Sequence, residues 1–510
     1  MSGPCCITVD AVIVLERHDQ LDLDDYRRVV CDHEPIEIDP ALLRLVEERR
    51  RAMDEHLATG AVAYGVTTGL GYLNKRPVAA GDRLELQRAI LVGRAVGVGD
   101  PLPEDVVRGA LLLRLTGFLS GHAGVTPELC RLMTDRLNDG WYPVVPFSRP
   151  GTAGETVALC HLFQTFIGEG EVLVAGERIA AGPALARLGV APYELQLKEG
   201  LALINGAPLA PALAASLAWR AAVLLDHATL LGALAVALMG APTRPYSPRI
   251  GRLKGDEGQA RVHARLAEWW RGEPPADGPQ APVSLRVLPQ VHGAAHDQLD
   301  HLTLQLRREL RAVTDSPLFL EAEGDEPEGF YASGNFHSQA LSLSLDAVAI
   351  ACAQVGALAE KRLHRLLDTR FSGLPEQLSP EPGRGQAGVV ALHKAVLGLC
   401  AENRLLAAPA SVHASDASSG QEDFQAFTEL AADKLGRLLG NLELILAYEL
   451  VALRQARELS AGDLPAALAA AIDVVAAAIE PVARDRSLAP DIERARELLR
   501  SGGLLSARIG

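Results

Sequence analysis

Residues 145–171 read VPFSRPGTAGETVALCHLFQTFIGEGE, with the pentapeptide Gly151-Thr152-Ala153-Gly154-Glu155 at their centre. Residues 143–150, which lead into it, are rich in proline and favour a break between elements of secondary structure. Ala153 carries a methyl side chain. It therefore has no hydroxyl to lose, as a serine at this position would have.

The composition of the chain argues against several classes of protein. The 510 residues carry a formal net charge of −15 without a basic stripe, which disfavours a nucleic-acid-binding surface. The N-terminus lacks the basic start of a secretory signal, and no window reaches roughly 18 uninterrupted apolar residues, so we expect no membrane-spanning helix. The seven cysteines are scattered, which is typical of reduced thiols, and adjacent Cys5 and Cys6 lack the ligand spacing of a zinc site. We expect a cytoplasmic protein without a metal site.

Hydrophobic periodicity predicts a mostly α-helical fold. Apolar residues recur at intervals of three and four over stretches much longer than an average helix. Such stretches are expected to form long helices packed in a central bundle. They are residues 82–119, 199–238, 336–367 and 424–456.

Strand signals are few, and prolines and glycines mark the breaks. We expect a strand within residues 7–15 and a small hairpin around Gly176, within residues 172–179. Further breaks are expected at residues 242–248, 273–282 and 373–385, and residues 271–282 are expected to form a mobile loop. The β elements are thus small and lie mainly in the N-terminal part.

Several separated segments, in this order, resemble the aromatic amino-acid ammonia-lyases and the related aminomutases. Besides the run at residues 145–171, they are YGVTTGLG from Tyr64, LQRAILVGRAVGVGDPLPEDVVR, EGLALINGAP with Asn205, SLRVLPQVHGA with Arg286 and Gln290, TDSPLF, SGNFHSQALSLSLD with Phe336, and SSGQEDFQAF with Glu422. Each segment alone is a weak signal, but together they span most of the chain. The resemblance implies the long-helix fold of that family, with an N-terminal domain at residues 1–200 and a helical bundle at residues 201–510. It also implies a homotetramer whose active sites combine residues from several subunits.

The resemblance implies a role for each matching residue. Tyr64 matches the base that removes the substrate's β-proton, on a loop whose glycines allow it to move. Arg286 matches the arginine that pairs with the substrate carboxylate, a task suited to the planar guanidinium fork. Asn205 matches the asparagine that contacts the substrate and the family's prosthetic group, a methylidene-imidazolone ring. Glu422 matches an acid near the substrate amine. Phe336 is expected as a wall of the pocket, with Gln290 also among the substrate-binding residues.

Each of these residues also has a plain structural interpretation. Tyr64 could pack under a glycine-rich turn, and Arg286 could form a surface salt bridge. Asn205 could cap a helix break, and Phe336 could belong to the core. Glu422 could complement the dipole at a helix N-terminus.

The departures from the family pattern concern its electrophile. In the family an Ala-Ser-Gly triplet cyclises and loses water to give a methylidene-imidazolone, whereas this chain has Thr152-Ala153-Gly154. Arg94 follows Gly93 where the family has Ser-His, Val283 replaces a second tyrosine, and Glu155 replaces an aspartate. Arg94 and Val283 are therefore expected to line an altered substrate site, with Glu155 as an acid or base.

The sequence therefore predicts an enzyme of ammonia-lyase fold that acts without the imidazolone and needs no cofactor. Elimination, conjugate addition or intramolecular cyclisation on a carboxylate-bearing, amino-acid-derived substrate are the candidate reactions, with Tyr64, Glu155 and Glu422 as acid–base groups. A role in the biosynthesis of specialised metabolites is inferred from the divergence alone. One alternative is a catalytically inactive ligand-binding or regulatory protein. Another is an ammonia-lyase with a non-standard imidazolone formed at Thr152-Ala153-Gly154.

Overall fold

The computed structural model describes residues 12–174, 176–273 and 278–506. Cys5, Cys6 and the first half of the strand expected at residues 7–15 lie outside the described residues. The chain divides into two compact units. Unit 1 comprises the chain up to Ser216 together with Leu304–Ser342 and Ala410–Leu430, and unit 2 comprises Leu217–Thr303, Leu343–Pro409 and the chain from Ala431.

Unit 1 combines short helices with small sheets. Strands β1 and β2 pair in parallel, β3, β4 and β5 form an antiparallel sheet, and β6 pairs with β7. Its helices and strands are β1 (Ile13–Leu15), α1 (Leu23–Val30), β2 (Ile36–Ile38), α2 (Pro40–Ala58), α3 (Arg83–Val92), α4 (Glu104–Phe118), α5 (Pro127–Asn138), β3 (Tyr142–Pro143), α6 (Thr156–Phe163), β4 (Glu171–Val174), β5 (Glu177–Ala180), α7 (Ala181–Arg187), α8 (Glu199–Ile204), β6 (Leu318–Leu320) and β7 (Gly329–Tyr331).

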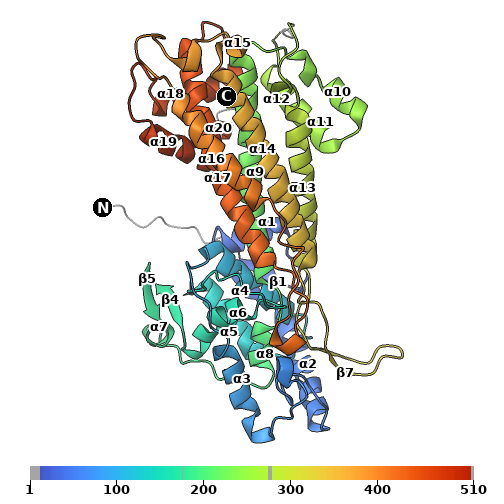
Figure 1. Ribbon diagram of the computed structural model, residues 1–510. Coiled ribbons are helices and arrows are strands. Elements are labelled where there is room, and N and C mark those ends of the chain that lie inside the picture. The colour runs from blue at the N-terminus through green and yellow to red at the C-terminus, as the bar shows by residue number, and fades with distance from the viewer. Residues whose placement is uncertain (1–11, 175, 274–277, 507–510) are drawn as a thin grey trace. The chain divides into compact units, whose positions relative to one another are not determined.

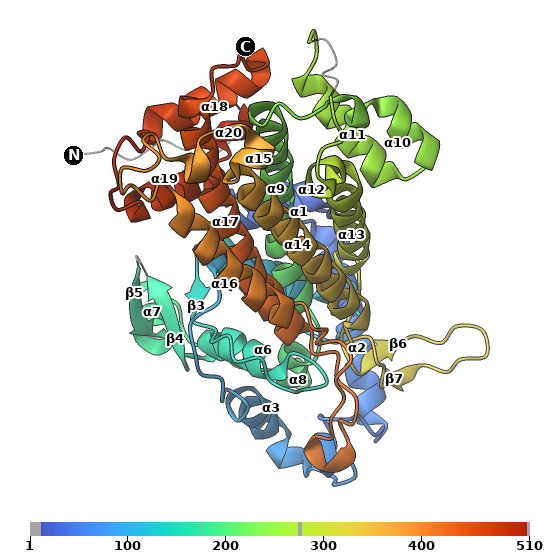
Figure 2. The ribbon, with the colours of Figure 1, turned by 45° about the horizontal axis from the view of Figure 1, so that its top comes forward.

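Unit 2 is helical in its described residues, and its long helices lie side by side in both views (Figure 1, Figure 2). Four helices contribute residues to both units: α9 (Leu209–Leu238), α13 (Leu288–Glu309), α14 (Gln339–Leu366) and α17 (Thr428–Leu459). The others are α10 (Pro248–Lys254), α11 (Glu257–Trp269), α12 (Val283–Arg286), α15 (Thr369–Ser372), α16 (Val390–Leu406), α18 (Ala466–Ala478), α19 (Ala489–Arg500) and α20 (Gly503–Ser506).

The mostly α-helical fold predicted from the sequence is confirmed. Helices α14 and α17 occupy the stretches expected at residues 336–367 and 424–456, and β4 and β5 form the expected hairpin, with Val172 opposite Ile179. The stretch at residues 82–119 was expected to form one helix, and this was wrong, because the segment between α3 and α4 contains glycines and prolines. The stretch at residues 199–238 is likewise divided, between α8 and α9, at Asn205-Gly206-Ala207-Pro208.

Two helical segments are long and apolar enough to cross a membrane by length and composition alone. They are Glu199–Leu238, which contains α8, the break after it and α9, and Gln339–Leu366, which is α14. Their most apolar windows are 78% and 61% buried within the protein. Because buried core helices pass the same test, these segments are weak evidence for a membrane span.

Candidate functional site

The triplet Thr152-Ala153-Gly154 lies in unit 1, directly before α6, and borders a pocket. The pocket is small, with room for about one water molecule. Segments that are distant in the sequence meet here, because its lining comes from three parts of the chain. The lining residues are Pro150, Thr152, Ala153, Gly154, Glu155, Phe336, Ser338, Ala426, Phe427, Thr428 and Glu429.

The backbone of the triplet is held by Glu422. The Ala153 N–H donates to Oε2 of Glu422 over 2.9 Å, and the Thr152 hydroxyl donates to the Gly154 carbonyl. Glu422 itself is fixed in a tight loop, where it forms an antiparallel bridge with Ala417. Helix α17 begins only at Thr428, so Glu422 is not in the first turn of a helix. The structure therefore brings Glu422 and the triplet together, as expected for one site.

Phe336 forms one wall of this pocket. A Cβ built on Gly154 would lie 3.6 Å from the Phe336 ring and 3.7 Å from the carbonyl oxygen of Gly206, which places Gly154 against both. Next to Phe336, the hydroxyls of Ser338 and Thr428 share a buried hydrogen bond of 2.7 Å. This bond joins the start of α14 to the start of α17 beside the triplet.

Glu155 caps the N-terminus of α9. Its Oε2 accepts a hydrogen bond of 2.6 Å from the N–H of Leu209, and its Oε1 accepts one of 2.6 Å from the N–H of Ala210. These groups have no partner within the helix, so a carboxylate here satisfies them and complements the helix dipole. Burial nevertheless raises the pKa of Glu155 well above its ordinary value, and the two backbone hydrogen bonds oppose this effect. The contacts of Glu155 are those of a structural cap.

Glu429, which the sequence analysis missed, is the second buried carboxyl group of the pocket. It lies in the first turn of α17 and is 8% exposed. Burial raises its pKa to about 7, and the positive charge of Arg149 opposes the rise. A carboxyl group with such a pKa exchanges a proton near neutral pH, which suits a general acid or base. In the sequence it reads as an ordinary acidic residue at a helix start.

Tyr64 lies on a loop that contacts the loop of Glu422. The phenol oxygen accepts a hydrogen bond of 2.8 Å from the N–H of Gly71, within its own loop. The Asn74 side chain donates to the Gln421 side chain over 2.9 Å, beside the contact of the turn Gly71–Leu73 with the turn Ser418–Gly420. The predicted base and the predicted acid thus sit on two loops that touch each other.

Asn205 lies at the end of α8, where its amide nitrogen donates to the carbonyl of Ser316 over 2.5 Å. Beneath this contact is a buried charge cluster in which Asp315 pairs with Arg114 at 2.6 Å and with Lys198 at 2.7 Å. Arg114 also donates to the backbone carbonyl of Asn205 over 2.9 Å. These bonds fix the peptide segment that faces Gly154.

Arg94 does not line the pocket beside the triplet. Its guanidinium lies after the end of α3 and donates weakly, over 3.4 Å, to the carbonyl of Ile90. The same carbonyl accepts a hydrogen bond from the thiol of buried Cys160. Burial raises the pKa of Cys160 to about 12, and the charge of Arg94 opposes this rise.

Val283, Arg286 and Gln290 belong to unit 2. Arg286 and Gln290 line a pocket that is open to solvent, and Nε of Arg286 donates to the carbonyl of Ala281 over 2.9 Å. The side-chain oxygen of Gln290 is buried and has no hydrogen-bond partner among the described residues. Val283 is 59% exposed. Arg286, at the end of α12, and Gln290, in the first turn of α13, therefore share one pocket.

Comparison with known proteins identifies the family. A model of the family described as aromatic amino acid lyase matches residues 21–480. The chain belongs to the aromatic amino acid lyase family. It is 36% identical to a protein named histidine ammonia-lyase from Symbiobacterium thermophilum, over 98% of this chain and 96% of that one.

Solved structures of other family members share the fold. The tyrosine aminomutase of Streptomyces globisporus superposes with a TM-score of 0.90 at 29% identity, covering 98% of each chain. The histidine ammonia-lyase of Trypanosoma cruzi gives a TM-score of 0.86 at 28% identity, over 98% of this chain and 95% of that one. The resemblance inferred from the ordered motifs is thereby confirmed.

The residues of the triplet do not fit the prosthetic group that the family forms. The methylidene carbon of the imidazolone derives from a serine that loses its hydroxyl, and the methyl side chain of Ala153 cannot lose water. The Ala153 N–H is engaged with Glu422. This family member therefore presents a methyl group and two buried carboxyl groups, Glu155 and Glu429, at its triplet.

Proposed function

We propose that this aromatic amino acid lyase family member acts without a methylidene-imidazolone, by acid–base catalysis. The candidate reactions are elimination, conjugate addition and intramolecular cyclisation on a carboxylate-bearing, amino-acid-derived substrate. The methyl side chain of Ala153 carries this proposal. An enzyme without the electrophile cannot use it to acidify a β-proton, so its substrate must already carry an activating group.

Glu429 supplies an acid–base group for such chemistry. Its pKa of about 7 leaves it divided between protonated and ionised forms at neutral pH. Both forms are then available, one to donate a proton to the substrate and the other to accept one. Both carboxyl oxygens of Glu155 accept hydrogen bonds from backbone N–H groups of α9. We therefore assign to Glu155 the role of fixing the backbone next to the triplet, and to Glu429 the role of proton transfer.

Tyr64 and Glu422 complete the proposed set. The hydrogen bond from the Gly71 N–H to the Tyr64 oxygen fixes the orientation of the phenol that we propose as the base. One carboxyl oxygen of Glu422 accepts a hydrogen bond from the Ala153 N–H. The other oxygen can accept a hydrogen bond from a substrate amine. Asn205 and Phe336 would then shape the pocket next to these groups.

Arg286 and Gln290 are proposed to bind the substrate carboxylate. The guanidinium fork offers two parallel hydrogen bonds to the two carboxylate oxygens. In a homotetramer of the kind that the family resemblance implies, these residues would come from a different subunit than Tyr64 and Glu422. Arg94 is proposed to attract a second anionic group of the substrate, and Val283 to give an apolar edge.

Intact mass spectrometry tests the absence of the imidazolone. We expect the mass of the purified chain to equal the mass calculated from its sequence, without loss of water. A mass lower by one or more waters would overturn the proposal in favour of the non-standard imidazolone. Release of ammonia from histidine, tyrosine or phenylalanine would also contradict it.

The catalytic assignments are tested with isosteric variants and a panel of substrates. The panel contains amino-acid derivatives with an activated β-position and α,β-unsaturated carboxylates, and products are followed by mass spectrometry. Glu429→Gln and Tyr64→Phe should each lower kcat by about 10²-fold or more while retaining substrate binding, because general acid–base catalysis contributes on that scale. Glu497→Gln, on the exposed face of α19, is the matched control. Binding of a panel member without turnover by the wild type would instead favour the inactive, ligand-binding alternative.

A shared active site predicts complementation between inactive variants. If Arg286 acts in one site with Glu429 of another subunit, a mixed oligomer of Arg286→Ala and Glu429→Gln chains contains some intact sites. In a random, equal mixture each of the two residues is native in about half of the sites, so about a quarter of the sites should be active. The oligomeric state is measured in parallel by light scattering. A monomeric chain that is active would refute the shared site and leave the acid–base proposal standing.

A further inference from the structure

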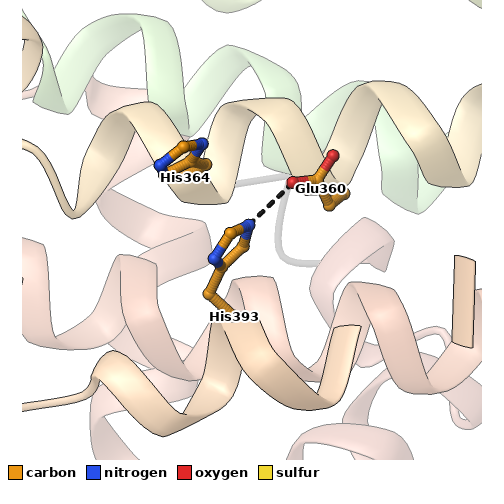
Figure 3. Close-up of side chains that lie close together, drawn as sticks. All are labelled: Glu360, His364 and His393. Atoms are coloured by element: carbon orange, nitrogen blue, oxygen red, sulfur yellow. Dashed lines mark hydrogen bonds and ion pairs between the residues drawn. The ribbon is translucent and has the colours of Figure 1, made fainter. Parts of the chain in front are cut away.

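Two histidines and a glutamate converge in unit 2, on helices that take no part in the pocket beside Ala153. Glu360 and His364 lie one turn apart on α14, and His393 lies on α16 (Figure 3). A spacing of four residues places Glu360 and His364 on the same helical face. One ligand atom from each of the three side chains lies within 4.8 Å of the others.

We propose that Glu360, His364 and His393 form a binding site for a single Zn²⁺ ion. Two imidazoles and one carboxylate are a donor set that suits zinc, and three protein ligands leave a fourth position for water. The site is independent of the proposed acid–base function.

The ligand atoms are near enough to reach a single zinc ion after the side chains move. Tetrahedral bonds of about 2.0–2.1 Å place neighbouring ligand atoms about 3.3 Å apart. The His393 Nε2 and the Glu360 Oε1 are 2.7 Å apart, so this pair must open by a few tenths of an ångström. The widest pair, at up to 4.8 Å, must close by about 1.5 Å. Small side-chain rotations on two fixed helices provide such movements.

The histidine rings require the larger change. Their centroids are 4.5 Å apart and their planes differ by 17°, so the rings are stacked. An imidazole nitrogen binds metal in the plane of its ring, and the rings must therefore tilt apart to point at one ion. The His364 side chain is exposed and can turn if it leaves its contacts with His393 and Arg365, whereas Glu360 is only 3% exposed and fixes the centre of the site.

The charges around the cluster allow a cation but compete with it. Lys361 pairs with the Glu360 Oε2 at 2.8 Å, and Arg365 contacts the Nδ1 of His364 at 3.3 Å. The Lys361 side chain is 53% exposed and can turn into solvent when zinc takes its place.

The sequence gives little sign of this cluster. His393 follows His364 at a distance too long for a zinc motif, and only the packing of α14 against α16 joins them (Figure 3). A Glu-X-X-X-His pattern on a helix occurs often without a metal.

Isothermal titration of the full-length, chelator-treated protein with zinc chloride tests the site. We expect one zinc ion per chain, with affinity reduced at least about tenfold in His364→Ala and in His393→Ala. His301→Ala, an exposed histidine on α13, is the matched control and should bind like the wild type. Equal affinity in the wild type and in His364→Ala would overturn the proposal.

Three further measurements test which side chains hold the metal. Co²⁺ in place of zinc should give a spectrum without the charge-transfer bands of thiolate ligands, and such bands would assign the metal to cysteines and overturn the site. Lys361→Met should tighten zinc binding, because it removes the competing ammonium from Glu360, whereas weaker binding would contradict the geometry. Zinc should also raise the melting temperature of the wild type but not that of His393→Ala, a comparison that remains informative if the variant is less stable.

Discussion

Replacing Glu429 by glutamine removes one titrating group from the pocket beside Ala153 and nearly preserves its shape. In the unfolded chain the pKa of this carboxyl group is near its ordinary value of 4.5, and in the folded protein burial raises the pKa to about 7. Between these two values the folded protein holds a proton that the unfolded chain has released. The stabilising contribution of the protonated group is therefore fully present below about pH 4.5 and is lost as the pH rises through about pH 7.

The magnitude follows from the same two pKa values. Each pKa unit corresponds to about 1.4 kcal/mol, so the whole contribution is about 3 kcal/mol. Between about pH 5 and about pH 8, about 2.5 kcal/mol of it should disappear from the wild type. Glutamine does not titrate, so the stability of Glu429→Gln relative to the wild type should rise by that amount over the same interval. Any cost of burying the amide is independent of pH and shifts the whole curve without changing this slope.

Urea unfolding of both proteins at a series of pH values measures the difference in the free energy of unfolding. Other titrating groups, including most of the contribution of Glu155, cancel in the comparison. Glu497→Gln, at an exposed position on α19, controls for the loss of a carboxylate and should follow the wild type at every pH. Parallel pH profiles for the wild type and Glu429→Gln would refute the raised pKa and, with it, the acid–base role proposed for Glu429.

Three further variants or measurements probe the surroundings of the pocket. Asp315→Asn leaves two buried cations, one of them Lys198, without their carboxylate, and should lower the free energy of unfolding by about 3–5 kcal/mol, as measured in urea. Gly71→Ala places a Cβ 2.4 Å from the Ser418 hydroxyl at a φ of +55°, so it should displace the Tyr64 loop and lower turnover with little change in overall stability, and Ser418→Ala in the same chain should restore part of the loss. Cys160 is buried with a pKa of about 12, so iodoacetamide should leave it unmodified in the native protein at neutral pH, as peptide mass spectrometry can show, and rapid labelling would disprove its burial.

The sequence predicts the long helices well, because their apolar periodicity is dictated by burial. It predicts the breaks less well. The stretch at residues 82–119 keeps helical periodicity across a segment that contains Gly97, Gly99 and Pro101, and the backbone there cannot continue the helix. Periodicity indicates which side chains face the core. The end of a helix depends instead on the backbone conformations that a few residues, such as glycine and proline, favour.

The candidate site is predicted in part for a similar reason. Glu422 was found through the order of motifs, and the structure places it on the backbone of Ala153. Glu429 was missed because its chemical significance comes from burial against residues more than two hundred positions away in the sequence. Glu155 was expected as an acid or base, and only the structure shows its two bonds to the start of α9. These bonds do not test the acid–base role expected from the sequence, and we propose the structural role in its place.

The backbone around Ala153 is held by hydrogen bonds to two glutamate side chains. Glu422 holds the amide of Ala153, and the Glu155 side chain, just after the triplet, accepts two hydrogen bonds from the start of α9. None of these three bonds involves the side chain of residue 153. The side chain at this position can therefore be exchanged with little effect on the path of the chain, so that this residue can change in evolution while the backbone around it is kept.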